Sequence, residues 1–389
     1  MSTVKDAISQ AVDRLADELD ALSKKIHDNP ELAYQEVKAS AWLCEFLGKQ
    51  GFKVEQGVGG VETAFRATLE TGEGPTIAIL CEYDALPGIG HACGHNIIAT
   101  SGAGAGAALA AVKGQLPKGR VQVIGTPAEE GGGGKIKLIQ AGVFKDVDAA
   151  MMIHGFDRTL LHQDLLGIAR ATLEFRGKAS HASADPWEGV NALDACVQTY
   201  NAVAMLRQQV RPDCRVHGII TSGGAAANII PEFASATFYM RAPRIDTMWE
   251  LYRRVVACAE GAARAAGCEL KVIQHDSVYE PMKSSRVLLD LFQANMTTVG
   301  LREGEPIPDR KGSSDVGNVS QVLPTIQPMI GIAPLGMAIH TRDFADAAVK
   351  PLARQGMVAA AKTMAMTTFD LLAEPARVKA AKKEFADAS

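Results

Sequence analysis

The sequence lacks any concentration of positive charge. Its 40 Lys and Arg are balanced by 44 Asp and Glu, the formal net charge is −4, and no block of basic residues occurs. Nucleic-acid binding needs clustered Lys and Arg to neutralise phosphates, and attachment to an anionic membrane surface needs similar clusters. The sequence therefore argues against nucleic acid and against a membrane as partners.

Long apolar runs are also missing. The longest stretch of low polarity, 97–112, is rich in Gly and Ala and is shorter than the roughly 20 apolar residues that span a bilayer. The first residues, Met-Ser-Thr-Val-Lys-Asp, show no signal peptide. Seven cysteines, an odd number without close spacing, favour no disulfide framework. We therefore expect a protein of the reducing cytoplasm.

Hydrophobic residues are sufficient for a large core. They make up 47% of the chain, and the length of 389 residues favours two domains, or one large domain with an insertion. In the first part of the chain, predicted strands alternate with predicted helices, which favours an α/β sheet covered on both faces. The strands are expected at 63–69, 76–81, 121–126 and 149–154, and the helices at 8–26, 37–50, 97–112 and 136–141.

The pattern changes after about residue 165. Strands at 168–176, 216–222, 233–241 and 269–275, with helices at 190–210 and 247–266, give the order β-α-β-β-α-β. This is the order of the ferredoxin-like unit. We therefore predict a mixed-sheet α/β domain formed by 1–165 and 281–389, with an inserted ferredoxin-like α+β domain at 166–280. The charged tail after Pro375 is expected to be a solvated helix or disordered.

Unusual polar residues follow the predicted strands of the α/β domain. They are Glu82 and Asp84 after 76–81, Glu129 and Glu130 after 121–126, and His154 at the end of 149–154, joined by Cys93, His95 and the late His340. Sites in α/β sheets gather beyond the carboxyl ends of the strands. We therefore expect these side chains to meet at one edge of the sheet.

The residue types in this set suit a metal site. Thiolate, imidazole and carboxylate ligands together favour zinc or a neighbouring divalent ion. The predicted ligands are Cys93, His95, Glu130, His154 and His340. Glu129 is adjacent to Glu130, so the two side chains point to different sides, and one can ligate while the other moves protons.

Other motifs carry less weight. His27, His91, His162, His217 and His275 are interpreted as structural or surface residues. Gly134-Lys135 resembles the end of a phosphate-binding loop, but Glu129 stands where that loop needs Gly, and Ile136 where it needs Ser or Thr. We therefore assign no phosphate site there.

With these residues in hand, the chain resembles the di-metal aminoacylase and carboxypeptidase family of metallopeptidases. Within that family it is similar to the amidohydrolase branch that includes p-aminobenzoyl-glutamate hydrolase and Xaa-Arg dipeptidase. The resemblance extends from HDNPELAYQE to the helix after His340. It is carried by CEYDALPGIGHACGHN, GTPAEEGGGGK, GKASHASADPWEGVNALDA, HGIITSGGAAANIIPEFASATFYMRA and GSSDVGNVS.

The resemblance implies a role for each motif residue. Cys93 would bridge two divalent ions, zinc first and manganese or cobalt as alternatives. Glu130 and His340 would complete one ion, and His95 and His154 the other, with Asp84 supporting the ligands. Glu129 would act as general base and proton donor.

The inserted domain would act as a lid and as the surface of a homodimer. In it, Asn228 and Arg241 would hold a substrate carboxylate, and His181 would stabilise the oxyanion, reaching the metals of the partner chain.

One departure from the family pattern and two alternatives stay open. Other branches have a His ligand at the position of Glu82, and His95 is expected to replace it. The leading function is hydrolysis of N-acyl amino acids or dipeptides with a free carboxylate. The alternatives are a dipeptidase that prefers basic C-terminal residues and a catalytically idle binding or regulatory protein. Loss of Glu129 or of a ligand would favour the idle protein, and none is lost.

Overall fold

The computed structural model describes residues 2–307 and 311–387 and contains two compact units. Unit 1 is built from three stretches of chain, within 1–163, 282–311 and 318–389, and unit 2 from 164–281 and 312–317.

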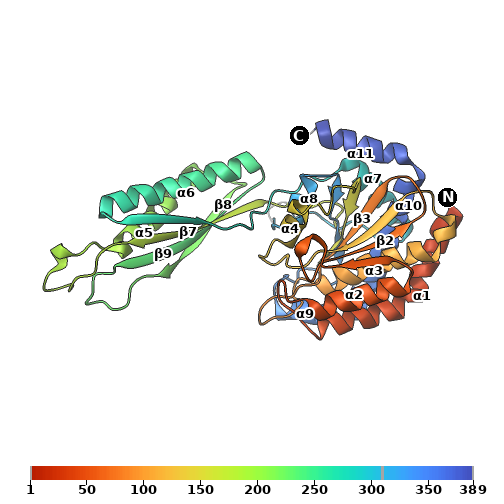
Figure 1. Cartoon of the computed structure of the whole chain (residues 1–389), viewed down its shortest axis with the longest axis horizontal. Coiled ribbons are helices and arrows are strands. Elements are labelled where there is room, and N and C mark those ends of the chain that lie inside the picture. The colour runs from red at the N-terminus through yellow and green to blue at the C-terminus, as the bar shows by residue number, and fades with distance from the viewer. Residues whose placement is uncertain (1, 308–310, 388–389) are drawn as a thin grey trace. The chain divides into compact units, whose positions relative to one another are not determined.

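Unit 1 contains a mixed sheet of six strands (Figure 1). Their order is β1 (Lys53–Gln56), β2 (Phe65–Glu70), β4 (Arg120–Gly125), β3 (Thr76–Cys81), β5 (Ala149–Met151) and β11 (Thr325–Ile326). Strands β4, β3, β5 and β11 are parallel, whereas β1 and β2 are antiparallel additions at one edge. A separate parallel pair joins β6 (His154–Phe156) to β12 (Met329–Gly331). The predicted mixed α/β fold is confirmed.

Helices pack around this sheet. They are α1 (Ser2–His27), α2 (Val37–Lys49), α3 (His95–Ala111), α4 (Gly134–Gln140), α7 (Arg286–Thr298), α9 (Arg342–Ala347), α10 (Pro351–Ala373) and α11 (Pro375–Asp387). The short helix α8 (Val316–Ser320) begins in unit 2 and ends in unit 1. Helix α3 is buried from His95 to Leu109 and packs against α1, α10 and β3. Its small residues permit this close approach, because a Cβ on Gly102 would lie 2.5 Å from the Sγ of Cys81. The Gly- and Ala-rich stretch is thus a core helix.

One strand of unit 1 differs from the sequence-based expectation, whereas the tail adopts the first of its two predicted forms, a helix. The predicted strand 149–154 is broken, because its partner changes: Met152 N donates to Ile326 O, but His154 N donates to Pro328 O. His154 therefore begins a new strand instead of ending the old one. The tail after Pro375 is helix α11, and its Glu384 carboxylate accepts hydrogen bonds from Ser285 Oγ and Arg286 N at the start of α7.

Unit 2 is a four-stranded antiparallel sheet with two helices. In chain order its elements are β7 (Gly167–Arg176), α5 (Ala192–Leu206), β8 (Arg215–Ser222), β9 (Phe233–Ala242), α6 (Ile245–Ala266) and β10 (Glu269–Gln274), and the strand order is β10-β7-β9-β8. Alternate residues of β7, among them Ala171, Leu173 and Phe175, are buried in one core with α5 and α6. Residues 312–317 also pack with unit 2, through Leu166 N and Gly312 O, although their position in the sequence predicts that they belong to the α/β domain.

Within residues 2–307 and 311–387, no helix combines the length and apolarity needed to cross a membrane. The seven cysteines are all free thiols, and five of them are buried: Cys44, Cys81, Cys93, Cys196 and Cys214.

Candidate metal centre

The polar side chains that were predicted to meet at one edge of the sheet lie at the ends of the central strands of unit 1. Glu82 follows β3, Glu130 lies in the turn after β4, and His154 opens β6. His95 is the first residue of α3. His340 reaches the same place although it is distant in sequence, because its backbone N donates to Ala92 O at 2.8 Å. The carboxyl edge of the parallel strands thus collects side chains from five separate segments, as expected for a site in an α/β sheet.

Three groups of potential metal ligands form there. One comprises Cys93, His95 and His154, a second Cys93, Glu130 and His340, and a third His95, Glu129 and Glu130; within each group the ligand atoms lie within 4.8 Å of one another. Cys93 belongs to the first two groups. The structure therefore brings together all five residues predicted as ligands, with Cys93 between two sets.

The imidazole rings of His95 and His154 are oriented by backbone carbonyl oxygens. His95 Nδ1 donates to Asp84 O at 2.8 Å, and His154 Nδ1 donates to Gly155 O at 2.7 Å. Because a carbonyl oxygen only accepts, each Nδ1 carries a hydrogen and each Nε2 is left as the ligand atom. His154 Nε2 lies 3.4 Å from Cys93 Sγ.

Asp84 links two parts of the site. One carboxylate oxygen lies 3.1 Å from His95 Nδ1, and the other accepts a hydrogen bond from Glu130 N at 2.8 Å. Burial lowers the pKa of His95, but the charge and hydrogen bond of Asp84, together with the interactions of Cys93, outweigh burial and hold that pKa well above its ordinary value. A cation that binds at His95 must therefore displace a proton, so its affinity falls as the pH falls.

Glu82 is paired with a lysine. Its Oε1 lies 2.5 Å from Lys135 Nζ, and both side chains are fully buried. The other oxygen, Oε2, lies 3.6 Å from His95 Nε2. The position where other branches of the family are expected to have a His ligand thus holds one half of a buried ion pair.

Unpartnered polar atoms make the cluster suitable for cations. Among residues 2–307 and 311–387, Glu82 Oε2, His95 Nε2 and Glu130 Oε1 are buried without a hydrogen-bond partner. Leaving such atoms unsatisfied is costly. The carboxylate oxygens offer lone pairs suited to a metal, and His95 Nε2 offers one when a cation displaces its proton. Together with the thiol of Cys93, they form a donor set that fits divalent ions of the zinc type.

Glu129 and Glu130 lie in a strained turn after β4. Ala128 has a φ of 61°, unusual for a residue other than glycine, and its N–H donates to the carboxylate of Glu36. Gly134 closes the turn, and a Cβ there would lie 1.7 Å from Pro127 O. Both glutamates are thereby held at the edge of the cluster, with Glu129 buried.

The three residues predicted to contact substrate lie in unit 2. His181 is an exposed loop residue whose Nδ1 accepts from Ala184 N, and its neighbour Ala182 donates to Asn228 O. Arg241, near the end of β9, donates to Ser313 Oγ at 3.1 Å, and its Nε is buried without a partner in the described ranges. Burial, followed by the charge of Arg170, lowers the pKa of Arg241.

Asn228 and Arg241 lie at opposite ends of unit 2. The loops with His181 and Asn228 adjoin the Phe233 end of β9, since Gly177 N donates to Glu232 O. Phe233 and Arg241 are separated by roughly 26 Å, at ~3.3 Å per residue along the strand. One carboxylate cannot reach both Asn228 and Arg241 of the same chain.

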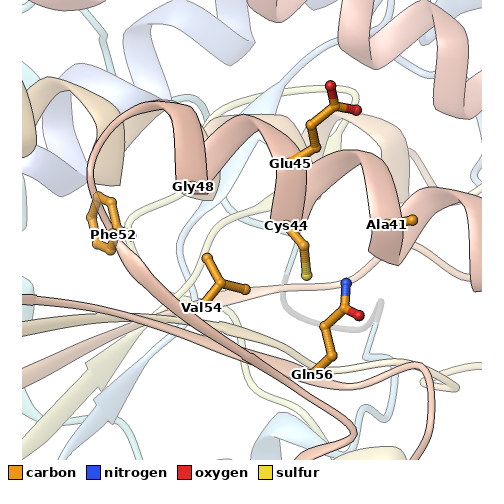
Figure 2. Close-up of a pocket in the computed structure, with 7 residues that line it drawn as sticks. All are labelled: Ala41, Cys44, Glu45, Gly48, Phe52, Val54 and Gln56. Carbon is orange, nitrogen blue, oxygen red and sulfur yellow. The ribbon is translucent and has the colours of Figure 1, made fainter.

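A separate hollow lies between α2 and β1 (Figure 2). The side chains of Cys44 and Gln56 point toward one another across it. Burial raises the pKa of the Cys44 thiol, so it is protonated at neutral pH and is a poor ligand and nucleophile. None of the residues that line the hollow is a histidine; they are Ala41, Cys44, Glu45, Gly48, Phe52, Val54 and Gln56.

The chain is similar in sequence to known peptidases and amide hydrolases. A model of peptidase family M20/M25/M40 matches residues 78–355. The chain is 38% identical over 400 residues to Xaa-Arg dipeptidase of Mus musculus, covering 99% of this chain and 93% of the relative. It is 30% identical over 459 residues to one of the subunits of p-aminobenzoyl-glutamate hydrolase from Escherichia coli, covering 98% and 94%.

Solved structures show the same fold. A dinuclear metal-binding peptidase of the M20 family from Bacillus subtilis superposes with a TM-score of 0.72 at 19% identity, over 93% of this chain and 99% of the other. The chain thus belongs to peptidase family M20/M25/M40. It is a metal-dependent hydrolase of peptide or amide bonds, as predicted from its motifs.

Two contributors to the site are not predicted by the sequence motifs. Lys135 forms a buried ion pair with Glu82, whereas the sequence Gly134-Lys135 only resembles the end of a phosphate-binding loop. A lysine in a Gly-rich turn beside predicted ligands could have suggested such an ion pair. Glu36 lies within the HDNPELAYQE segment, where nothing marks it as part of the site. Its contact with Ala128 joins residues 92 positions apart, and no local pattern shows such a contact.

Proposed function

We propose that this protein hydrolyses the amide bond of dipeptides or N-acyl amino acids that carry a free carboxylate. The observation that carries the proposal is Cys93, which is shared between two ligand groups beside Glu129. Cys93, Glu130 and His340 would hold one ion, and Cys93, His95 and His154 the other. Zinc suits this mixture of thiol and imidazole, with manganese and cobalt as alternatives.

The residues around the cluster have separate tasks. Divalent ions bound there supply Lewis acidity, which polarises the scissile carbonyl and acidifies water. Glu129 accepts a proton from the attacking water and delivers it to the departing amine nitrogen. The water oxygen forms a bond to the carbonyl carbon, giving an oxyanion, and the carbon–nitrogen bond then breaks to release the amine and the carboxylate. Asp84 keeps His95 and the backbone of Glu130 in place.

We expect the purified protein to carry up to two divalent ions per chain and to lose its activity on treatment with a chelator. A set of dipeptides and N-acyl amino acids, each assayed with added zinc, manganese or cobalt, measures the activity, and elemental analysis measures the metal. Metal-free protein that hydrolyses these substrates in the presence of chelator would contradict the proposal.

A second candidate is a dipeptidase that prefers basic C-terminal residues. A relative 38% identical over 99% of this chain is an Xaa-Arg dipeptidase, which supports this narrower choice. The same set of substrates separates the candidates, provided that it pairs dipeptides ending in Arg or Lys with dipeptides ending in Glu and with p-aminobenzoyl-glutamate. A higher kcat/KM for the basic dipeptides supports the narrower function, and a preference for the acidic substrates rejects it.

We assign recognition of the carboxylate to Arg241, with Asn228 of the second chain in the proposed dimer as a further contact. A guanidinium with a buried, unpartnered Nε in the described structure is prepared to bind an anion. Arg241→Ala should lower kcat/KM for substrates with a free carboxylate by about 10–100-fold, from the roughly 1.5–3 kcal/mol of a hydrogen bond to a charged group. The kcat/KM for amidated analogues should fall much less.

The matched control for Arg241 is Arg215→Ala. Arg215 lies opposite Arg241 on the paired strand β8, but it is exposed, and its guanidinium donates to the nearby Cys214 O. Arg215→Ala should leave kcat/KM unchanged for both the free and the amidated substrates. Equal losses for free and amidated substrates in Arg241→Ala would show that Arg241 does not bind that group.

We further propose that unit 2 is a ferredoxin-like lid, inserted at about 166–280, through which two chains form a homodimer. Strand β8 lies at one edge of the sheet and exposes Ile219 and Ile220, and such an edge is suited to pairing with a second copy. The distance between Asn228 and Arg241 supports this arrangement, because His181 and Asn228 can then serve the partner's site. Light scattering tests the dimer, and a monomeric mass would reject it.

Location in the reducing cytoplasm is also a proposal. It is supported by the seven free cysteines, five of them buried as thiols. Fractionation of cells that express the protein tests it, and recovery from a secreted or envelope fraction would reject it.

A further inference from the structure

Glu36 is a fully buried glutamate that joins three segments of unit 1. Its Oε1 accepts hydrogen bonds from Ala128 N at 2.8 Å and from Tyr34 N at 2.9 Å, and its Oε2 accepts one from Thr63 Oγ1 at 2.9 Å. Burial, supported by the charge of Asp84, raises the pKa of Glu36 to about 7, although the hydrogen bonds from Thr63 and Tyr34 oppose that rise. Burying a carboxyl group in this environment is unfavourable, so we expect Glu36 to have a role beyond local stability.

Capping of helix α2 is not that reason. Glu36 occupies the N-cap position of α2, where a side chain normally accepts hydrogen bonds from the first turn of the helix, but it makes no such bond. Glu31 caps α2 instead, because its carboxylate accepts from Lys38 N and Ala39 N. The Glu36 carboxylate is therefore directed away from its own helix, to the turn after β4.

Tyr34 reaches the other end of the same turn. Its hydroxyl donates to Gly132 O at 2.7 Å, and its φ of 63° is unusual for a tyrosine. A Cβ on Gly132 would lie 2.9 Å from the Tyr34 ring, so the two surfaces are in close contact. Tyr34 and Glu36 thus hold residues 128 and 132, on either side of Glu129 and Glu130.

We infer that Tyr34 and Glu36 form a clamp that positions Glu129 for proton transfer. The hydrogen bond from Ala128 N to Glu36 holds the positive φ of Ala128, the residue directly before Glu129. Without that bond, Ala128 is free to relax to an ordinary backbone conformation, which turns Glu129 away from the attacking water. The inference rests on the proposed function, and the clamp residues themselves do not touch substrate.

The test compares Glu36→Ala with Glu31→Ala. Both glutamates precede α2, and the carboxylate of each accepts hydrogen bonds from two backbone N–H groups, but only Glu36 reaches the turn after β4. We expect Glu36→Ala to lower kcat by about 10²-fold, as a small misplacement of a catalytic group does, with KM and bound metal unchanged. Glu36→Gln keeps one acceptor oxygen and should recover part of the loss. Glu31→Ala should keep the kcat of the wild type.

A double variant shows whether Glu36 acts through Glu129. In the Glu129→Gln background, Glu36→Ala should lower kcat by no more than about threefold further, because residues that act as one unit are not additive. If Glu36→Ala does not fold, Glu36→Gln and Tyr34→Phe are measured in both backgrounds, with the same non-additive loss expected.

Equal losses in the two backgrounds, loss of metal, or a change confined to KM would overturn the inference while leaving the proposed function intact. A wild-type protein that hydrolyses none of the amides would instead reject the proposed function, and the clamp with it.

Discussion

Replacing Glu129 by Gln is expected to lower kcat by about 10²–10⁴-fold, the usual contribution of a general acid–base group. Gln is nearly isosteric with Glu, so the turn after β4 and the ligand groups keep their geometry, and bound metal stays. Gln cannot take a proton from water or return one to the amine. Measurements of kcat together with elemental analysis therefore separate proton transfer from metal binding.

Two further variants serve as the control and the comparison for that measurement. Glu73→Gln changes the same chemical group at an exposed position and should leave kcat unaltered. Cys93→Ala should lose metal as well as activity, because Cys93 is shared between two ligand groups. Near-normal turnover in Glu129→Gln would show that another residue moves the proton.

The Glu129→Gln protein also tests whether active sites are shared between chains. Homodimers of Glu129→Gln and of His181→Ala should each be nearly inactive. Mixed under conditions that exchange subunits, they should regain activity, because one of the two sites in a heterodimer then has both residues intact. No recovery despite demonstrated exchange would mean that His181 acts on the site of its own chain or has no catalytic role.

Replacing Lys135 by Met is expected to destabilise unit 1 by about 3–5 kcal/mol, the cost of leaving one partner of a buried ion pair alone. Both Lys135 and Glu82 are fully buried, and Nζ lies 2.5 Å from Oε1. Once the ammonium is removed, Glu82 must lie charged in the interior or take up a proton. The midpoint of urea unfolding, measured by circular dichroism on chelator-treated protein, should fall accordingly.

The exposed pair of Lys49 and Glu45 provides the control. Its Nζ–Oε1 distance of 2.7 Å is close to that of the buried pair, but both side chains are more than half exposed. Lys49→Met should leave the urea midpoint almost unchanged, because solvent already screens such a pair. A second variant, Glu82→Gln with Lys135→Met, should recover much of the stability. An unchanged midpoint in Lys135→Met alone would show that Glu82 does not depend on its lysine.

Local patterns in the sequence predicted much of unit 1. The continuous apolar run TIAILC coincides with β3 at 76–81, because a strand buried on both faces needs apolar residues throughout. The order of strands then placed the polar residues that follow them at one edge of the sheet. For this reason Cys93, His95, Glu130, His154 and His340 could be grouped from the sequence, and the structure places them together. Their individual roles stay predictions.

Contacts between distant segments could not be predicted in this way. The break between β5 and β6 depends on a change of partner near Pro328, which the sequence of 149–154 does not contain. The interaction of Glu82 with Lys135 joins a strand end to the first turn of α4. Ala128, which has a positive φ, donates its N–H to Glu36 from another part of the chain. Each of these features depends on which segments become neighbours.

A ribosome makes residues 164–281 of unit 2 before it makes β11 or His340. Until Thr325 and Ile326 have emerged, β5 lacks the strand that pairs with it on that side. Until His340 has emerged, the group of Cys93, Glu130 and His340 is one member short. A nascent chain therefore cannot assemble the complete set of predicted ligands before residues 164–281 have been synthesised and the chain has been extended to His340.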